Sequence, residues 1–341
     1  MNAFEYVSSP IRVTFGSGTV KRIPDELSRL SQSAPLFLSS AQHEQTAQLI
    51  QDMLPGKVAG VFTEAVMHTP VRVTEKALLY VKEVKADCII SIGGGSTIGL
   101  GKAISIRTGL QHICIPTTYA GSEQTPVLGE TQDGKKTTRS DPKILPNTVI
   151  YDVDLTLTLP PSLSATSGMN AIAHAVEALY AQNSNPVINL LALEDSHTWR
   201  SRCLYGAWLC AVCLGNVGMA LHHKLCHTLG GSFNLPHAET HTIVLPHVLA
   251  YNAPAIPEVM TKLSEAIPDS NGDAIKGLNS LLTKLQVKRG LRDFGMKEED
   301  IDTAVEIALG NPYWNPRPVE RAPLREMVRR CWAGEEARAD L

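Results

Sequence analysis

Residues 221–247 read LHHKLCHTLGGSFNLPHAETHTIVLPH and hold six of the eleven histidines of the chain. His223 and His227 are four residues apart, so they share one face of a helix. Gly230 and Gly231 predict the end of this helix, because glycine accepts a left-handed C-terminal cap at little cost. A second helix is expected from about His237. This helix–turn–helix directs four imidazoles toward one cavity: His223, His227, His237 and His241.

Each of these histidines, taken singly, could equally be a hydrogen-bonded residue of the core. A cluster of imidazoles is costly to bury without a task, so the group as a whole favours a functional site. His222 is expected to be the exception. Adjacent helical positions diverge by about 100°, so His222 should point away from the face that carries His223.

A second stretch, residues 167–180, reads SGMNAIAHAVEALY and predicts an apolar helix. Asn170 and His174 are four residues apart in this helix and therefore lie on one face. We expect that face to meet the histidines of the first stretch.

The chain has 341 residues, which is long enough for two domains with substantial cores. Its hydrophobic fraction of 43% and charged fraction of 19% are those of an ordinary globular protein. A net charge of −3 gives no reason to expect nucleic acid or an anionic membrane as a partner. No apolar run approaches the roughly 20 residues of a membrane helix. Since the seven cysteines lie mostly in apolar runs, we expect a cytoplasmic protein with reduced thiols.

Short apolar strands alternate with amphipathic helices from Ile11 to about Val153. Strands are expected at residues 34–38, 58–62, 88–92, 112–115 and 148–151. This order predicts an α/β domain, a Rossmann-like parallel sheet with helices on both faces. Helical patterns dominate from Leu159, the longest at residues 207–229. We therefore expect a dinucleotide-binding domain over residues 1–158, an all-α domain over residues 159–341, and the active site in the cleft between them.

A glycine-rich turn at residues 93–96 follows the third expected strand and opens a helix. Small residues there let backbone amides approach a phosphate at the positive end of a helix. The turn is not the G-x-G-x-x-G fingerprint, because Ile98 stands at its last position, and it is not a P-loop. From the residues alone, a tight structural turn is as good an interpretation as a phosphate site. The segment that begins at Pro116 follows the next strand at its carboxyl end, where ligands of open α/β sheets collect.

Four segments together resemble the iron-containing alcohol dehydrogenase superfamily, whose fold is shared with dehydroquinate synthase. They are GGGSTIGLGKAI (residues 93–104), IPTTYAGSE (115–123), SGMNAIAHAVEALY (167–180) and HTLGGSFNLPHAETHTIVLPH (227–247). The longer string HHKLCHTLGGSFNLPHAETH is most similar to the maleylacetate reductase branch. The resemblance extends from about Phe15 to Pro318, and the motifs occur in the order found in the family.

The resemblance implies a nicotinamide cofactor and its contacts. The implied pyrophosphate contacts are Gly94, Gly95 and Ser96. Further implied cofactor contacts are Thr117, Thr118, Tyr119 and Lys136, although Lys136 could also be a solvated surface lysine. Residues 38–42, LSSAQ, lack the acidic residue that typically binds the adenosine ribose and repels a 2′-phosphate. We therefore expect both NADH and NADPH to be accepted.

The resemblance also bears on metal. The family usually binds a divalent ion through an Asp and a His four residues apart and through two more histidines, which map onto His223 and His237. Asn170 stands here in the place of the Asp. Three imidazoles and an amide make a poor site for a hard ion, so no metal is expected. The histidines would then act as hydrogen-bond donors and proton sources.

The implied reaction is the NAD(P)H-dependent reduction of the C=C bond of maleylacetate to 3-oxoadipate, in the degradation of aromatic compounds. The expected catalytic residues are His174, His223, His227, His237 and His241. Asn170 and Arg317 are expected to bind the dicarboxylate substrate, with Lys224 as a further candidate cation. A homodimer with no nucleic-acid or membrane partner completes the expectation.

Three other functions stay open at this point. A metal-dependent alcohol or polyol dehydrogenase would use His174, His223 and His237, and a chelator would inactivate it. A lyase of the dehydroquinate synthase type would not consume NADH stoichiometrically. A ligand-binding protein without activity would show no turnover in any assay.

Overall fold

The first half of the chain folds around a parallel sheet in the computed structural model, which describes residues 6–132, 135–193, 199–310 and 312–341. Only the backbone is described for residues 135, 136 and 199–202. The chain divides into two compact units, each described here by itself. The sheet unit comprises Ser8–Leu159 and His197–Gly215, and the helical unit comprises Met1–Val7, Pro160–Ser196 and Asn216–Leu341.

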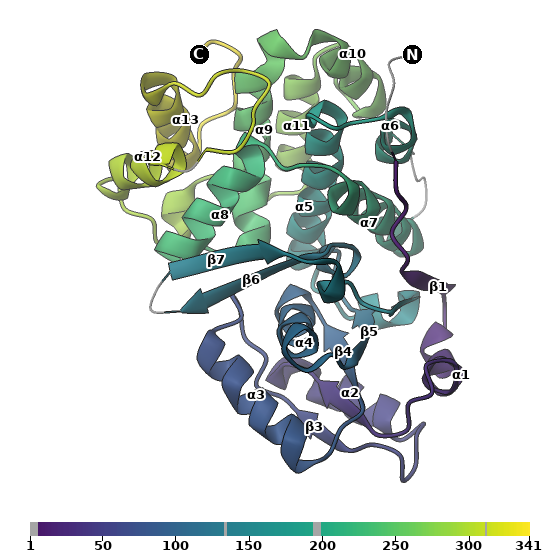
Figure 1. Ribbon diagram of the computed structural model, residues 1–341. Helices are drawn as coiled ribbons and strands as arrows, with labels where there is room; N and C mark the ends of the chain where they lie inside the picture. Colours follow the sequence, from purple (N-terminus) through teal and green to yellow (C-terminus); the bar gives the residue numbers. More distant parts are fainter. Residues whose placement is uncertain (1–5, 133–134, 194–198, 311) are drawn as a thin grey trace. The chain divides into compact units, whose positions relative to one another are not determined.

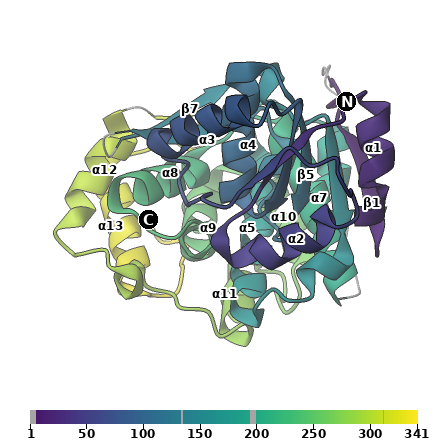
Figure 2. The same ribbon diagram turned by 90° about the horizontal axis from the view of Figure 1, so that it is seen from below.

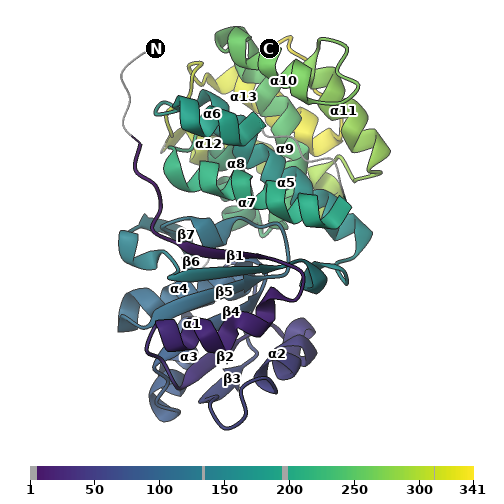
Figure 3. The same ribbon diagram turned by 90° about the vertical axis from the view of Figure 1, so that its right-hand side faces the viewer.

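Six strands form the sheet, in the spatial order β1-β8-β5-β4-β2-β3. Every neighbouring pair is parallel, which confirms the predicted α/β class. Figure 3 shows β5, β4, β2 and β3 following one another across the sheet. The strands are β1 (Arg12–Gly16), β2 (Pro35–Leu38), β3 (Gly60–Phe62), β4 (Cys88–Gly93), β5 (Gln111–Pro116) and β8 (Thr148–Asp152).

Helices cover both faces of the sheet, as its buried central strands require. The core on one face takes residues from α1 and α2, and the core on the other face takes residues from α3 and α4 (Figure 2). Strand β4 serves both cores, because Ile90 points to one and Ile89 to the other. The helices are α1 (Ile23–Arg29), α2 (Glu44–Gln51), α3 (Val71–Glu83) and α4 (Gly95–Thr108), with the 3₁₀ turns η1 (Thr19–Arg22), η2 (Ala41–His43), η3 (Ser122–Gln124), η4 (Pro142–Ile144) and η5 (Val153–Thr156).

An antiparallel hairpin of β6 (Val127–Gln132) and β7 (Lys135–Ser140) was not predicted (Figure 1). Its second strand, KKTTRS, carries no apolar side chain, so apolar alternation did not mark it as a strand. A buried lysine ties the chain entering this hairpin to α4. Lys102 donates hydrogen bonds to the carbonyl oxygens of Thr125 at 2.8 Å and Val127 at 2.9 Å.

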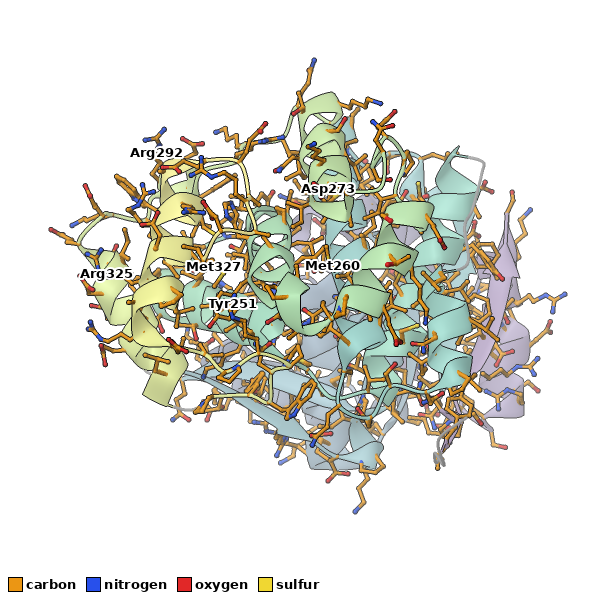
Figure 4. The ribbon with its side chains drawn as sticks, turned by 90° about the horizontal axis from the view of Figure 1, so that it is seen from above. Tyr251, Met260, Asp273, Arg292, Arg325 and Met327 are labelled. Atoms are coloured by element: carbon orange, nitrogen blue, oxygen red, sulfur yellow. The ribbon has the colours of Figure 1, made fainter. Side chains whose placement is uncertain are left out.

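Helix α5 (Pro161–Tyr180) of the helical unit begins close to Leu159, from which helices were predicted to dominate. Proline is well suited to the first turn of a helix, since its missing N–H would have no partner there. The unit contains α5 (Pro161–Tyr180), α6 (Pro186–Leu193), α8 (Leu221–Phe233), α9 (His237–Asn252), α10 (Pro257–Ala266), α11 (Ala274–Lys284), α12 (Asp300–Gly310) and α13 (Arg321–Ala333), with the 3₁₀ turns η6 (Ala253–Ala255) and η7 (Leu291–Phe294). Tyr251 of α9 and Met327 of α13 belong to one of its cores (Figure 4).

The helix predicted over residues 207–229 is two helices, α7 (Trp199–Asn216) and α8. The predicted division at residues 158 and 159 assigns α7 to the all-α domain, but α7 packs with the sheet unit. Aromatic contacts hold α7 against the sheet. The ring centroids of Tyr205 and Trp208 lie 5.8 Å and 6.2 Å from that of Phe15 in β1.

The prediction that Gly230 and Gly231 end the first histidine helix was wrong. Helix α8 continues through both glycines to Phe233, and Asn234 forms the left-handed C-cap with φ of 53°. Asparagine also tolerates this conformation, which is why the stop signal was misplaced. The start of the second helix at His237 is confirmed.

Within the described residues, no single helix is long and apolar enough to cross a membrane. One bent pair, Cys203–Asn216 with Leu221–Phe233, meets the length and composition requirement only when its two helices are counted together.

Candidate functional site

The turn after β4 presents backbone amides at the N-terminus of α4. Gly93 has φ of 146°, and a Cβ atom there would lie 2.7 Å from Thr97 Oγ1. Gly94 is the N-cap and makes no side-chain capping bond, while Gly94, Gly95 and Ser96 are partly exposed. The first N–H groups of a helix have no partner inside it and favour an anion. The geometry predicted for a phosphate site is therefore present at this turn.

The predicted contacts after β5 lie against the same turn. Thr117 donates its backbone N–H to the carbonyl oxygen of Gly93 at 3.1 Å. A Cβ atom on Gly94 would come within 3.1 Å of Thr118 Oγ1, so only glycine leaves this approach unstrained. Tyr119 is buried behind them. The side chain of Lys136 lies outside the described residues, so its contact with a cofactor stays a prediction.

His43 joins the loops that follow β2 and β5, and sequence reasoning missed it. Its Nδ1 lies 3.0 Å from Ser40 Oγ and its Nε2 lies 3.1 Å from Thr117 Oγ1. Burial lowers the pKa of His43 below its usual value. Helices α2 and α4 lie on opposite faces of the sheet, so the adjacent ends of β2 and β4 form the switch point where ligands of such sheets bind.

Six imidazoles from α5, α8 and α9 form the second candidate centre. His241 of α9 is central, with ring-centroid distances of 5.1 Å to His223 and 4.3 Å to His237. His174 of α5 stacks on His223 at 5.4 Å. The donor atoms of His174, His223 and His241 all lie within 4.8 Å of one another. The structure thus brings together the predicted members His174, His223, His227, His237 and His241, with His227 at 6.0 Å from His223.

The expectation for His222 was wrong. It is fully buried, its ring centroid lies 4.8 Å from that of His241, and its Nε2 lies 3.0 Å from His241 Nδ1. His222 and His223 do point in different directions from α8. Helix α9 packs beside α8, however, and its His241 contacts both rings.

A buried carboxylate, missed from the sequence, anchors this cluster. Glu177 accepts hydrogen bonds from the backbone N–H of His222 at 3.0 Å and from Nδ1 of His223. Helix α8 has no side-chain cap of its own at Ala220, so Glu177 of α5 supplies the negative charge that a helix N-terminus favours. The sequence spacing could have indicated this role of Glu177. Glu177 lies three residues after His174 and therefore on the same side of α5.

Burial governs the charge of the cluster. It holds the pKa values of His174, His222 and His241 well below the usual range, and the neighbouring imidazoles lower them further. These three rings are therefore neutral near pH 7, where each carries one N–H and one bare nitrogen. Among the described residues, His174 Nδ1, His223 Nε2 and His241 Nε2 are buried without a hydrogen-bond partner.

Other predicted residues lie around or apart from the cluster. Asn170 is buried one turn before His174 on α5. His227 Nδ1 lies 3.4 Å from Tyr313 Oη, and Lys224 Nζ lies 5.4 Å from the centre of the Tyr313 ring. Arg317 instead packs its guanidinium over the ring of Tyr251 at 4.2 Å and donates Nη1–H to the Tyr251 carbonyl oxygen at 2.8 Å.

The chain is similar to known proteins along nearly its whole length. Residues 10–153 match the iron-containing alcohol dehydrogenase family, and residues 194–332 match the C-terminal part of the Fe-containing alcohol dehydrogenase family. The maleylacetate reductase of Rhizobium sp. (strain MTP-10005) is 46% identical over 350 residues, which cover 98% of this chain and 99% of that protein.

Solved structures share the fold. The crystal structure of maleylacetate reductase from Agrobacterium tumefaciens superimposes with a TM-score of 0.91 at 46% identity, covering 98% of this chain and 100% of that one. A sulfoacetaldehyde reductase from Bifidobacterium kashiwanohense, solved in complex with NAD⁺, has the same fold at 22% identity, with a TM-score of 0.85 and coverage of 96% of this chain and 98% of that one.

The Glu177 contact yields a first prediction. Glu177→Gln should lower kcat for maleylacetate reduction by about 10–100-fold, the usual cost of losing a carboxylate that orients a functional histidine. The KM for NADH should stay unchanged, because Glu177 lies in the helical unit and the expected cofactor contacts lie in the sheet unit. Steady-state kinetics on the folded variant measures both, and Glu177→Asp should recover part of the loss.

Glu130→Gln is the matched control, since Glu130 is also a nearly buried carboxylate, paired with Arg107 in the sheet unit. An equal loss of kcat in both variants, or an unchanged kcat in Glu177→Gln, would contradict a positioning role for Glu177.

Proposed function

The chain belongs to the iron-containing alcohol dehydrogenase family, and we propose that it reduces the C=C bond of maleylacetate to 3-oxoadipate with a nicotinamide cofactor. One observation carries the proposal: buried imidazole nitrogens of His174, His223 and His241 converge within 4.8 Å, while Asn170 stands where the family has a carboxylate. These imidazoles offer hydrogen bonds to an oxygen that gains negative charge.

The substrate chemistry fits such a cluster. The C=C bond of maleylacetate is conjugated to a ketone, so hydride from the nicotinamide adds at the alkene carbon β to the ketone. The π pair of the alkene then forms the C=C bond between the α carbon and the former carbonyl carbon, and the π pair of the carbonyl moves onto oxygen to give an enolate. Neutral N–H groups of the cluster stabilise this oxygen in a site shielded from water, where hydrogen bonds are worth more than in solution.

The reaction then consumes one proton at the α carbon. The buried pair of Glu177 and His223 is placed to carry this proton within the cluster. The Nδ1 side of His223 is engaged by Glu177, which leaves Nε2 as the atom that exchanges a proton with the substrate. Protonation of the α carbon completes 3-oxoadipate and restores the neutral ring.

Metal is not part of the proposed mechanism, because the donor set fits the family's metal poorly. Asn170 offers a neutral amide in the carboxylate position, and the nearby Glu177 is occupied by His223 and the N-terminus of α8. A hard divalent ion prefers oxygen anions to imidazoles alone. A metal-dependent dehydrogenase is the second candidate, since three imidazole nitrogens can hold an ion such as Zn²⁺, which would polarise the ketone.

The cofactor is proposed to bind by its pyrophosphate at Gly94, Gly95 and Ser96. Partly exposed amides at the N-terminus of α4 support this placement. The loop after β2 contains Ser39, Ser40 and Gln42 and no acidic residue, so it does not repel a 2′-phosphate. We therefore propose that NADH and NADPH are both substrates.

A cation is needed for the dicarboxylate, and Lys224 is the best candidate. Arg317 is engaged by the ring and the carbonyl oxygen of Tyr251, which accounts for its position without a substrate. Lys224 lies beside Tyr313, and Tyr313 contacts His227 of the cluster. An ammonium group at this place pairs with one carboxylate of the substrate. A homodimer and a cytoplasmic location belong to the same proposal.

The function is tested by following NADH oxidation with maleylacetate before and after treatment with EDTA. We expect one NADH consumed per 3-oxoadipate formed, metal content well below one equivalent, and turnover unchanged by the chelator. Loss of turnover on chelation, restored by Zn²⁺ or Fe²⁺, would replace the metal-free mechanism with the second candidate. Turnover without net NADH consumption would indicate a lyase.

The cofactor site yields a further prediction. A Cβ atom on Gly95 would meet only Ala120 at 3.6 Å, an ordinary contact, so Gly95→Val should fold. Its branched side chain should block the pyrophosphate and raise the KM for NADH by about 10-fold or more. Gly95→Ala is the smaller control. An unchanged KM in folded Gly95→Val would show that the pyrophosphate binds elsewhere.

The substrate cation is tested by a pair of variants. Lys224→Met should raise the KM for maleylacetate by about 10-fold or more, the scale of one charged hydrogen bond, and leave the KM for NADH unchanged. Arg317→Met should lower the melting temperature with little change in the KM for maleylacetate. The opposite result, a raised KM only in Arg317→Met, would return the substrate contact to Arg317.

A further inference from the structure

A second group of metal-ligating side chains lies inside the helical unit, apart from the position of the family's metal. It consists of His222, Cys226 and His241, whose donor atoms lie within 4.8 Å of one another. His222 and Cys226 are four residues apart on α8 and share one face, while His241 comes from α9. We propose that these three residues bind a soft or borderline metal ion of the Zn²⁺ and Cd²⁺ class.

The distances suit a small coordination sphere. His222 Nε2 lies 3.0 Å from His241 Nδ1, and Cys226 Sγ lies 3.7 Å from His222 Nε2. In a tetrahedral zinc site with bonds of about 2.0 Å to nitrogen and about 2.3 Å to sulfur, donor atoms stand roughly 3.3–3.6 Å apart. The remaining pair of donor atoms also lies within 4.8 Å, so rotations of the three side chains would bring all three donors onto one ion.

The chemical types of the three donor atoms determine which metal ions bind. A thiolate with two imidazoles prefers zinc and cadmium, whereas hard ions such as Mg²⁺ and Mn²⁺ prefer carboxylates. The nearest carboxylate, Glu177, is bound to His223 and to the backbone of α8. All three ligands are at most 1% exposed, so an ion held there would be shielded from water and would exchange slowly.

Binding of the ion moves two protons, one on the cysteine and one between the two imidazoles. The Cys226 thiol loses its proton to solvent as the sulfur–metal bond forms. The single proton between His222 Nε2 and His241 Nδ1 moves to the other nitrogen of the ring that carried it, because His222 Nδ1 and His241 Nε2 have no hydrogen-bond partner among the described residues. Each ion therefore displaces one proton and fixes the tautomer of His241.

A consequence for turnover follows, and this part alone rests on the proposed function. An ion on His241 Nδ1 leaves the proton of His241 fixed on Nε2, so this ring can no longer exchange a proton with its neighbours during turnover, and Zn²⁺ should inhibit the reductase. Binding itself is independent of that function, because it is observed without substrate or cofactor.

The test is a titration of the full chain, treated with chelator and then freed of it, with Cd²⁺ in buffer without thiols. We expect a sulfur-to-cadmium charge-transfer absorption in the ultraviolet that saturates at about one ion per chain. The band should vanish in Cys226→Ser, Cys226→Ala and His222→Ala. It should persist in Cys203→Ser, the control at an exposed thiol, and in His174→Ala, which lacks a ligand of the family position.

Two results would overturn the site: no band in the folded wild-type chain, or a band that survives in a folded Cys226 variant. Loss of the band in His174→Ala would show that His174 is also needed to hold the ion and would contradict a site made of these three residues. In the activity arm, micromolar Zn²⁺ should inhibit the wild-type chain and Cys203→Ser but not Cys226→Ala. Inhibition of Cys226→Ala to the same degree would contradict the link between this ion and His241.

Discussion

The candidate active site depends on the carboxylate of Glu177, which contacts both a helix N-terminus and an imidazole. This carboxylate caps the N-terminus of α8 through the backbone N–H of His222, and it bonds Nδ1 of His223 in the first turn of the same helix. A buried carboxylate is tolerable only when its oxygens are paired, so the helix terminus and the imidazole stabilise the charge as much as it orients them. The N-terminus of α8 and the orientation of the His223 ring are therefore both tied to α5 by the same carboxylate.

Three of the imidazoles around this carboxylate are kept neutral. Burial lowers the pKa values of His174, His222 and His241, so the cluster offers N–H donors without a net positive charge. Asn170 continues the same pattern, since an amide replaces the carboxylate that a metal would need. In the proposed mechanism, a site of this kind stabilises an oxygen anion by hydrogen bonds.

Much of this could be read from the sequence. Strand–helix alternation predicted the parallel sheet, and the glycines at residues 93–95 predicted the turn that opens helix α4. Spacing by four residues predicted the convergence of the histidines. What the sequence did not reveal depends on packing between elements. His222 joins the cluster because α9 lies beside α8, and Glu177 acts across a helix pair. The hairpin of β6 and β7 carries too few apolar residues to show a period, and Asn234 ended a helix where glycine was expected.

The central claim is that hydride adds to the alkene and that the cluster stabilises the resulting enolate. It is tested most directly by reducing maleylacetate with NADH deuterated at the transferred position in ordinary water, and by the reverse labelling in D₂O. We expect 3-oxoadipate with one deuterium from the cofactor at the carbon β to the ketone and one solvent hydrogen at the α carbon, with the ketone intact. Deuterium at the former carbonyl carbon of a hydroxy acid would contradict it and indicate an alcohol dehydrogenase.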